Sequence, residues 1–449
     1  MNLHSRLLAR EAEGRPLRVG LIGAGKFGSM FLSQARTTPG LHVAAIADLS
    51  PDRAAAALAR TGWPAGQGGA TGLSDALARR ATWLTDDAAA MLSAGGIDVA
   101  IDATGDPHAG CAHAALAIDN GVHIVMVNVE ADALAGPLLA KWAREAGVVY
   151  SLAYGDQPAL ICELVDWARS AGFEVAGAGK WTKYLPHYHG STPDTVWENY
   201  GFSPEQVATG DYNPQMFNSF LDGTKSAIEM TAVANATGLT PAEGGLTFET
   251  CDAEGLAELL KPRGDGGMLE HMGQVEVISC FNWDGTPADG ALRYGVWVTF
   301  AAASDYTARC FTEYGIAADM SGRYAALYRP YHMIGLELGV SVALAGLRGE
   351  ATGSATGFRA DVAAVAKRDL AAGEMLDGEG GYTVWGRLMP AAHSLADGVL
   401  PIGLAKGVRL RNAVPAMHAV RWQDVDIDDA DPAVRLRREM ETVFREAPA

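Results

Sequence analysis

The sequence is poor in the features that mark secreted proteins and membrane proteins. It has five cysteines in 449 residues, an odd number without a CxxC pair, so we expect neither a disulfide framework nor a structural zinc site. No run of 18 apolar residues occurs, which argues against a transmembrane helix, and residues 1–13 lack the apolar core of a signal peptide. These absences predict a cytoplasmic protein.

Positive charge is also scarce. Lys and Arg number 35 against 53 Asp and Glu, which gives a formal net charge of −18. Binding to nucleic acid or to anionic membranes relies on clustered cations, so neither partner is expected. A hydrophobic fraction of 49% is enough for several cores and predicts two or three domains.

A glycine-rich turn follows the first apolar run. Residues 17–22 lead into GAGKFG, a helical pattern comes next, and a second apolar run ends in an aspartate. In this order, glycines permit a tight turn, backbone approach to a pyrophosphate and close helix packing, while the helix start attracts phosphate. The turn predicts a nucleotide site, with contacts from Gly23, Gly25, Lys26, Phe27, Gly28 and Asp48.

Apolar runs and helical patterns then alternate up to about residue 155. The runs at 97–107, 123–131 and 148–158 are typical of buried parallel strands. The alternation predicts an α/β fold with a Rossmann-type doubly wound parallel sheet. Because ligands bind at the carboxyl ends of such strands, the loops there are expected to contact the cofactor through Thr104, Gly105 and Asn128.

The pattern changes after the last of these runs. Amphipathic helices mixed with alternating strand-like runs predict an α+β domain for catalysis and dimerisation, and GSATGF at 353–358 is typical of a linker. A small β-rich module with a helical tail follows. We therefore expect three domains, at 1–158, 159–352 and 353–449.

The residues after Asp48 leave the choice of nicotinamide open. An acid at the end of the second strand favours NAD, because it binds the ribose hydroxyls. Ser50 and Arg53 are suited to hold a 2′-phosphate, although Arg53 is equally well explained as a solvated residue in the next helix. We take NADP as the expected cofactor and NAD as the alternative.

Acidic residues follow two of the strands. Glu130 is suited to acid–base chemistry, whereas Asp132 is as well explained as an acid that stabilises a helix start. Asp156 is a suitable ligand for Mg²⁺ or Mn²⁺, or else the cap of the helix that begins near Pro158.

Two further segments supply the remaining candidates. Lys225 and Glu229 share one helix face, either as a surface ion pair or as part of a pocket, and the polar residues before them favour the pocket. The loop 180–192 is typical of a substrate lid, in which Lys183 is placed to stabilise an oxyanion. The expected catalytic residues are Lys183, Lys225 and Glu130. The expected substrate contacts are Asn218, Ser219, Thr224 and His187, and the expected metal ligands are Asp156 and Glu229.

At these residues the chain resembles the 1-deoxy-D-xylulose 5-phosphate reductoisomerase-like enzymes, a group related to homoserine dehydrogenases. The segments that carry the resemblance are RVGLIGAGKFGSMFLSQ, VNVEADALAGPLL, YGDQPALICELVDWA, STPDTVW and FNSFLDGTKSAIEM. The resemblance implies NADPH, a divalent cation, a homodimer and a phosphorylated ketose as substrate, converted to 2-C-methyl-D-erythritol 4-phosphate for isoprenoid synthesis. The stretch 359–430 resembles a SAF-type module.

One departure from the resemblance concerns the catalytic lysine. Asn128 and Glu130 match an Asn-Lys-Glu motif, but Val129 takes the lysine position, so Lys183 or Lys225 has to serve instead. The leading expectation is an NADPH-dependent reductoisomerase. The alternative is an NAD(P)-dependent oxidoreductase or oxidoisomerase of another sugar acid or hydroxy acid.

Overall fold

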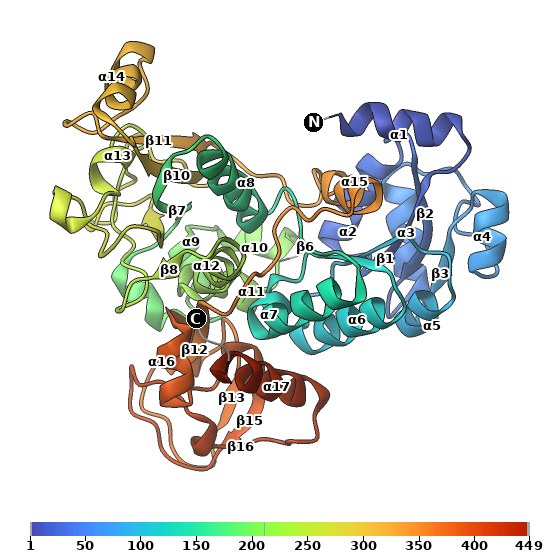
Figure 1. The fold of residues 1–449 in the computed structure, drawn as a ribbon. Helices are drawn as coiled ribbons and strands as arrows, with labels where there is room; N and C mark the ends of the chain where they lie inside the picture. Colours follow the sequence, from blue (N-terminus) through green and yellow to red (C-terminus); the bar gives the residue numbers. More distant parts are fainter. Residues whose placement is uncertain (1, 211, 447–449) are drawn as a thin grey trace. The chain divides into compact units, whose positions relative to one another are not determined.

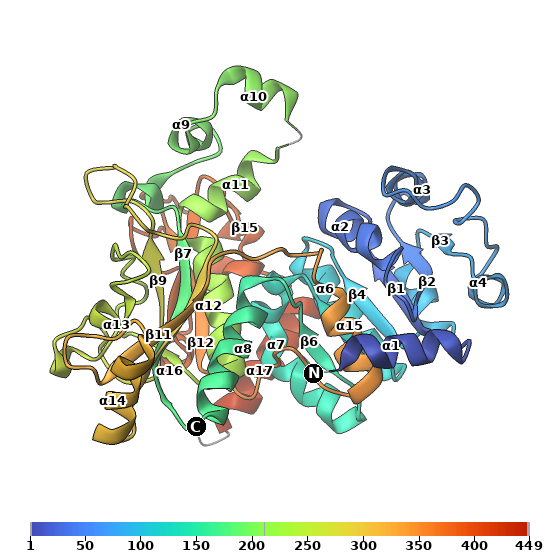
Figure 2. The same ribbon diagram turned by 90° about the horizontal axis from the view of Figure 1, so that it is seen from above.

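The computed structural model describes residues 2–210 and 212–446, and the chain divides into two compact units. The first comprises Met1–Leu160 with Met333–Thr356, and the second comprises Ile161–His332 with Gly357–Ala449 (Figures 1 and 2). The second unit therefore holds both the middle of the chain and its C-terminal module. The division into three domains stays a prediction.

The first unit is built on a six-stranded sheet in the order β3-β2-β1-β4-β5-β6. All neighbouring strands pair in parallel, and the crossovers run outwards from β1 in both directions, as in dinucleotide-binding folds. The Rossmann-type α/β prediction is confirmed. The strands are β1 (Leu17–Ile22), β2 (Leu41–Ala47), β3 (Trp83–Thr85), β4 (Val99–Asp102), β5 (His123–Met126) and β6 (Tyr150–Leu152).

Several helices of this unit begin at a capping side chain. Ser50, Asp87, Asp106 and Asn128 each precede a helix and accept a hydrogen bond from a backbone N–H in its first turn. The helices are α1 (Leu3–Ala12), α2 (Lys26–Ala35), α3 (Pro51–Arg60), α4 (Leu73–Arg79), α5 (Ala88–Ser93), α6 (Pro107–Asp119), α7 (Val129–Ala146) and α15 (Gly339–Arg348). Helix α8 (Gln157–Ser170) runs from the first unit into the second.

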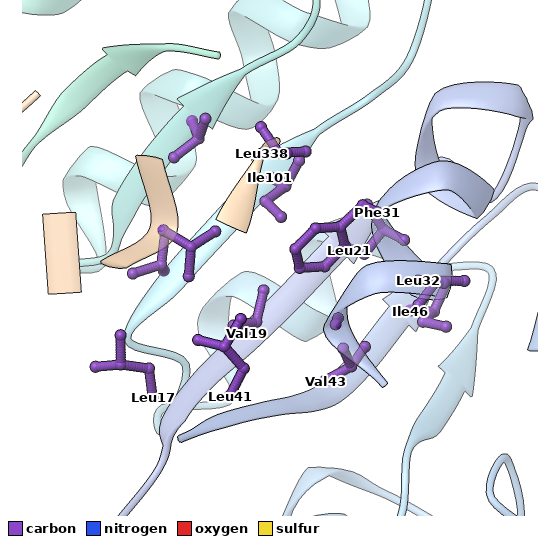
Figure 3. Close-up of a cluster of buried hydrophobic side chains, with 14 of the residues drawn as sticks. Leu17, Val19, Leu21, Phe31, Leu32, Leu41, Val43, Ile46, Ile101 and Leu338 are labelled. Atoms are coloured by element: carbon purple, nitrogen blue, oxygen red, sulfur yellow. The ribbon is translucent and has the colours of Figure 1, made fainter. Parts of the chain in front are cut away.

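The core of the first unit lies between the sheet and its helices. Leu21 of β1 packs with Phe31 and Leu32 of α2, and Leu338, just before α15, joins the same buried cluster (Figure 3). Each such side chain contributes roughly 1.5–3 kcal/mol when it is fully buried. The segment around α15 thus completes a core that the N-terminal residues begin.

The second unit contains a five-stranded mixed sheet in the order β11-β10-β7-β9-β8. The central strand β7 pairs antiparallel with β10 and parallel with β9. Trp181 and Trp297 are buried together in a core on one side of this sheet. The strands are β7 (Glu174–Thr182), β8 (Thr240–Pro241), β9 (Gln274–Ser279), β10 (Val296–Ala301) and β11 (Tyr324–Arg329).

The rest of this unit consists of helices and two small antiparallel sheets. The sheets contain β12 (Ala360–Ala366) with β14 (Val384–Pro390), and β13 (Met375–Asp377) with β15 (Lys406–Leu410) and β16 (Val425–Asp426). The helices are α9 (Val196–Tyr200), α10 (Pro204–Thr209), α11 (Pro214–Leu221), α12 (Thr224–Thr237), α13 (Leu256–Leu259), α14 (Asp305–Tyr314), α16 (Ala391–Asp397) and α17 (Pro432–Glu446). The likeness of 359–430 to a SAF-type module stays a prediction.

Among the residues described, no helix combines the length and apolar character needed to cross a bilayer.

A buried acid in α7 makes the stability of the first unit depend on pH. Burial raises the pKa of Asp132 to about 6 from its usual value of 3.8, even though the Tyr150 hydroxyl donates to its carboxylate at 3.0 Å. A carboxyl whose folded-state pKa is raised contributes stability at low pH and loses it as the pH rises through that pKa.

We expect Asp132→Asn to stabilise the protein above pH 6 by up to roughly 3 kcal/mol, because the amide accepts from Tyr150 without carrying charge. Urea denaturation of both proteins between pH 4 and 8 measures this difference. Asp52→Asn, at an exposed position in α3, is the control. An offset between Asp132→Asn and the parent that stays constant from pH 4 to 8 would contradict the assignment.

Candidate functional site

The glycine turn lies at the carboxyl end of β1. Gly23 has φ +92°, and a Cβ at Gly28 would lie 2.2 Å from the Gly23 carbonyl oxygen, so both positions require glycine. A Cβ at Gly25 meets nothing within 4 Å, and neither does one at Gly105 in the loop after β4. The open space over Gly25 is where a pyrophosphate is expected to approach the backbone.

Helix α2 begins directly after this turn. Gly25 stands before its first residue, and no side chain caps the helix start. The first-turn N–H groups of Lys26 and Phe27 therefore face a region suited to phosphate, and Lys26 itself is exposed.

Asp48, at the end of β2, is held by the protein on both oxygens. Its Oδ2 accepts the Ala24 N–H at 2.8 Å, and its Oδ1 accepts from the Ser50 N–H at 3.0 Å and from the Arg53 guanidinium at 2.6 Å. Burial raises the pKa of Asp48, but these hydrogen bonds outweigh it and leave the pKa below its usual value. The side chain of Arg53 is 56% exposed, whereas that of Asp48 is 2% exposed.

A second acid at a strand end organises the next loop. Asp102, the buried last residue of β4, accepts the Thr104 N–H and hydroxyl at 3.0 and 2.6 Å and lies 2.6 Å from His113 Nδ1. Asn128 donates to the Thr104 hydroxyl at 3.0 Å and to the Asp106 carbonyl at 2.8 Å. Asp102 and His113 were not among the predicted residues. Asp102 could have been found from the sequence, because it is an acid at the end of an apolar run, as Asp48 is.

Lys225 and Glu229, predicted as a catalytic residue and a metal ligand, both lie in α12. The carboxylate of Glu229 pairs with the ammonium of Lys180 on β7, and both residues of this pair are only 4% exposed. This pair was not predicted, because its members are far apart in sequence. Lys225 lies in the first turn of α12 and is partly buried.

The predicted metal site finds no support in these side chains. The carboxylate of Glu229 is already neutralised by a contacting ammonium, and Asp156 accepts the Gln157 N–H at 2.9 Å. Within residues 2–210 and 212–446, no group of three His, Cys, Asp or Glu side chains is arranged to bind a metal. The donor set therefore does not fit Mg²⁺ or Mn²⁺.

Lys183 lies just beyond the end of β7. Its ammonium donates to the Asn199 carbonyl at 2.6 Å and lies over the rings of Tyr200 and Phe281. Burial lowers the pKa of Lys183, and the nearby Arg293 guanidinium lowers it further. A partly buried lysine with a lowered pKa is a candidate for proton transfer.

The polar residues before Lys225 are more buried than their predicted role suggested. Asn218 donates to the Ser191 and Gly380 carbonyls, both at 2.9 Å, and the Thr224 hydroxyl accepts the Gly386 N–H at 2.7 Å. The Ser219 hydroxyl donates to a carbonyl within its own helix. The Asn218 and Thr224 side chains thus connect α11 and α12 to the C-terminal module.

Two further predicted residues are more accessible. Glu130 lies in the first turn of α7 and is partly exposed. His187 is exposed in the short helix Pro186–Gly190, where its ring meets that of Tyr188 edge-on. Their predicted roles remain untested.

Two family models match successive segments of the chain. Residues 17–127 match the oxidoreductase family with an NAD-binding Rossmann fold known as GFO/IDH/MocA. Residues 155–338 match the catalytic domain of oxidoreductase DRL. The matched segments are thus those of oxidoreductases, and the first is of an NAD-binding kind. A comparison with curated proteins gave no match.

Similar solved structures include three oxidoreductases. The WlbA dehydrogenase from Bordetella pertussis is 21% identical over 38% of this chain and 49% of its own, with a TM-score of 0.27. Biliverdin reductase from Synechocystis sp. PCC 6803 is 20% identical over 43% and 54%, with a TM-score of 0.27. The myo-inositol dehydrogenase from Lactobacillus casei is 16% identical over 40% and 50%, with a TM-score of 0.28. The chain thus covers about half the length of the first of these structures, 49%.

These findings correct the resemblance to 1-deoxy-D-xylulose 5-phosphate reductoisomerase-like enzymes. The nucleotide-binding segment matches the GFO/IDH/MocA family instead, and residues 155–338 match the catalytic domain of oxidoreductase DRL. Glycine turns are shared by many oxidoreductases, so the quoted segments did not identify a substrate. The matches therefore give no support to an isomerisation or to an isoprenoid product.

The Lys180–Glu229 pair generates a prediction about stability. Glu229→Gln leaves a buried ammonium without its counter-charge, and we expect a loss of roughly 3–5 kcal/mol in the free energy of unfolding. Lys180→Met combined with Glu229→Met removes both charges and is expected to cost much less. Urea denaturation of the three proteins checks this order. If Mg²⁺ or Mn²⁺ raised the melting temperature of the parent but not of Glu229→Gln, the ion-pair assignment would be wrong.

Proposed function

We propose that the chain transfers a hydride between NADP(H) and a carbinol or carbonyl carbon of a polyhydroxylated substrate, that is, a sugar, a sugar acid or a polyol. The observation that carries this proposal is the open glycine turn at Gly25. It lies within a segment that matches an NAD-binding oxidoreductase family, and a segment matching a catalytic domain follows it. A homodimer remains part of the proposal.

The state of Asp48 supports NADP as the cofactor. Both of its oxygens are in use and its side chain is 2% exposed, so it is poorly placed to bind ribose hydroxyls. The guanidinium of Arg53 lies 2.6 Å from the Asp48 carboxylate, and the Arg53 side chain is 56% exposed. A planar guanidinium next to the Ser50 hydroxyl suits a 2′-phosphate.

In the proposed reaction, Lys183 is the group that accepts and donates the proton of the substrate hydroxyl. The nicotinamide, when bound, accepts or supplies the hydride. During oxidation, neutral Lys183 takes the proton from the substrate hydroxyl; during reduction, its ammonium returns that proton to the developing alkoxide. The lowered pKa of Lys183 makes the neutral amine accessible closer to neutral pH. Lys225, Glu130 and His187 are proposed as further contacts to substrate hydroxyls.

The function is tested by incubating the purified chain with NADP⁺ and, in turn, myo-inositol, glucose and gluconate. Appearance of the reduced nicotinamide is followed by its absorbance. We expect turnover with at least one substrate class. NADPH binding without turnover of any polyol, sugar or sugar acid would overturn the proposed substrate class.

The cofactor proposal predicts a selective effect of Arg53→Ala. Hydrogen bonds to a charged group contribute roughly 1.5–3 kcal/mol, so the Kd for NADPH should rise roughly 10- to 100-fold while that for NADH changes little. Titration of nicotinamide fluorescence measures both constants. Arg15→Ala, at an exposed site before β1, is the control. An equal loss of affinity for NADPH and NADH would mean that Arg53 does not bind the 2′-phosphate.

The proton-transfer proposal predicts that Lys183→Met lowers kcat by roughly 10²–10⁴-fold with NADPH affinity retained. Lys183→Arg should not restore activity, because a guanidinium stays protonated. In the parent, kcat/KM for oxidation should rise with pH and level off below the usual lysine pKa of 10.5. A pH profile unchanged by Lys183→Met would rule out this role.

A further inference from the structure

A lysine of the C-terminal module contacts residues from the middle of the sequence. Lys367 follows β12, and its side chain is only 3% exposed. Its ammonium lies 2.8 Å from the carboxylate of Asp222 and donates to the carbonyls of Ser191 and Gly381, both at 2.7 Å. A buried ammonium is tolerated only when it is paired and hydrogen-bonded, so these contacts define one arrangement of the segments involved.

The three partners belong to separate segments of the second unit. Ser191 ends the segment 183–191, here called the substrate loop. Asp222 forms the turn between α11 and α12, and Gly381 lies in the C-terminal module. Asn218 makes a parallel link, because its amide bridges the Ser191 and Gly380 carbonyls at 2.9 Å each. Lys367 and Asn218 therefore both connect the substrate loop to the C-terminal module.

Asp222 passes this constraint on to a histidine–tyrosine pair in the substrate loop. The ring of His189 places Nδ1 2.7 Å from the Asp222 carbonyl and Nε2 2.9 Å from the Tyr184 hydroxyl. A carbonyl only accepts, so Nδ1 carries the proton and Nε2 accepts from Tyr184. Trp385 of the module stacks on the same ring, with centroids 3.9 Å apart.

The same aspartate fixes the first turn of α12. Its Oδ1 accepts the Thr224 N–H at 2.9 Å, one residue before Lys225. The turn at Gly223 leaves little room, since a Cβ there would lie 3.3 Å from the His189 ring. A shift of Asp222 would therefore move both the His189 ring and the start of α12.

We propose that Lys367 is a positioning residue: it holds the substrate loop and the first turn of α12 in their working arrangement, and the C-terminal module is thus part of the substrate-binding structure. This inference rests on the proposed function for the role of the loop. Lys367 acts through Asp222 and Ser191, and Trp385 supports the same loop by covering His189.

Hydrogen exchange of the full-length chain tests the positioning directly. Lys367→Met should speed amide exchange in 183–191 and 222–226 by roughly tenfold or more, while residues 17–60 and NADPH affinity stay unchanged. Lys367→Arg should keep exchange slow, because it restores the cation. Lys406→Met, at an exposed position in β15, is the matched control. Unchanged exchange in the loop, or equal acceleration across the whole second unit, would overturn the proposal.

Two further variants cover the case in which Lys367→Met does not fold. Asp222→Asn combined with Lys367→Met leaves no unpaired buried charge, and Trp385→Leu removes the ring stacking alone. Both should loosen the substrate loop in the exchange experiment. Slow exchange in both would contradict a role for this contact.

The His189 ring gives a spectroscopic readout. Burial lowers the pKa of His189, and the Lys367 ammonium lowers it further. The hydrogen bond to the Asp222 backbone and the charge of Asp222 raise this pKa. In NMR titrations assigned with His189→Asn, the pKa of His189 should rise in Lys367→Met and return to the parent value in Lys367→Arg. An identical His189 titration in Lys367→Met and the parent would show that the cation does not reach the ring.

Kinetics separates this inference from the proposed function. With a substrate that the parent oxidises, Lys367→Met should raise KM for that substrate and leave KM for NADP⁺ unchanged. If the parent oxidises none of the substrates tested, the proposed function fails. The exchange and NMR results then still decide whether Lys367 positions the loop.

Discussion

The second unit depends on the requirement that a buried cation must meet a carboxylate. Among its described residues, four cations are almost fully buried, and each is paired with an acid from a distant part of the chain: Lys180 with Glu229, Lys261 with Asp319, Lys367 with Asp222, and Arg437 with Asp361. Desolvation makes an unpaired charge so costly that each pair admits few alternative arrangements of its segments. Apolar packing supplies most of the stability, while these pairs select one alignment of sheet, helices and module.

This requirement also explains which features the sequence revealed. The Rossmann sheet and the glycine turn depend on neighbours within a few residues, so hydrophobic periodicity and the glycine spacing predicted them. The α12 motif depended on a distant partner. Helical spacing placed Lys225 and Glu229 on one face, as a surface ion pair or as part of a pocket, but it did not show that Glu229 pairs with Lys180 of β7. Helical spacing predicts which residues share one face of a helix. It does not predict which element packs against that face.

The polar residues around α11 show the same limit. Asn218 and Thr224 were predicted to bind substrate because polar side chains beside apolar ones suggested a pocket. In the fold, Asn218 donates to the Ser191 and Gly380 carbonyls and Thr224 accepts the Gly386 N–H, while their predicted contact with substrate stays a prediction. A polar side chain needed to satisfy a distant carbonyl looks, in the sequence, the same as one that awaits a ligand. Asp102 is the opposite case, because its place at a strand end was visible but its partner His113 was not.

The first unit is assembled from two pieces of chain separated by most of the second unit. Leu338 and Val342 fill the core begun by β1, and Ser341 donates to the Leu152 carbonyl at the end of β6. On the ribosome, the core of the first unit is therefore complete only after the segment ending at Thr356 has emerged. Until then the part of the core that Leu338 and Val342 fill is uncovered, so biosynthesis of this protein passes through a long interval in which the N-terminal sheet exists without α15.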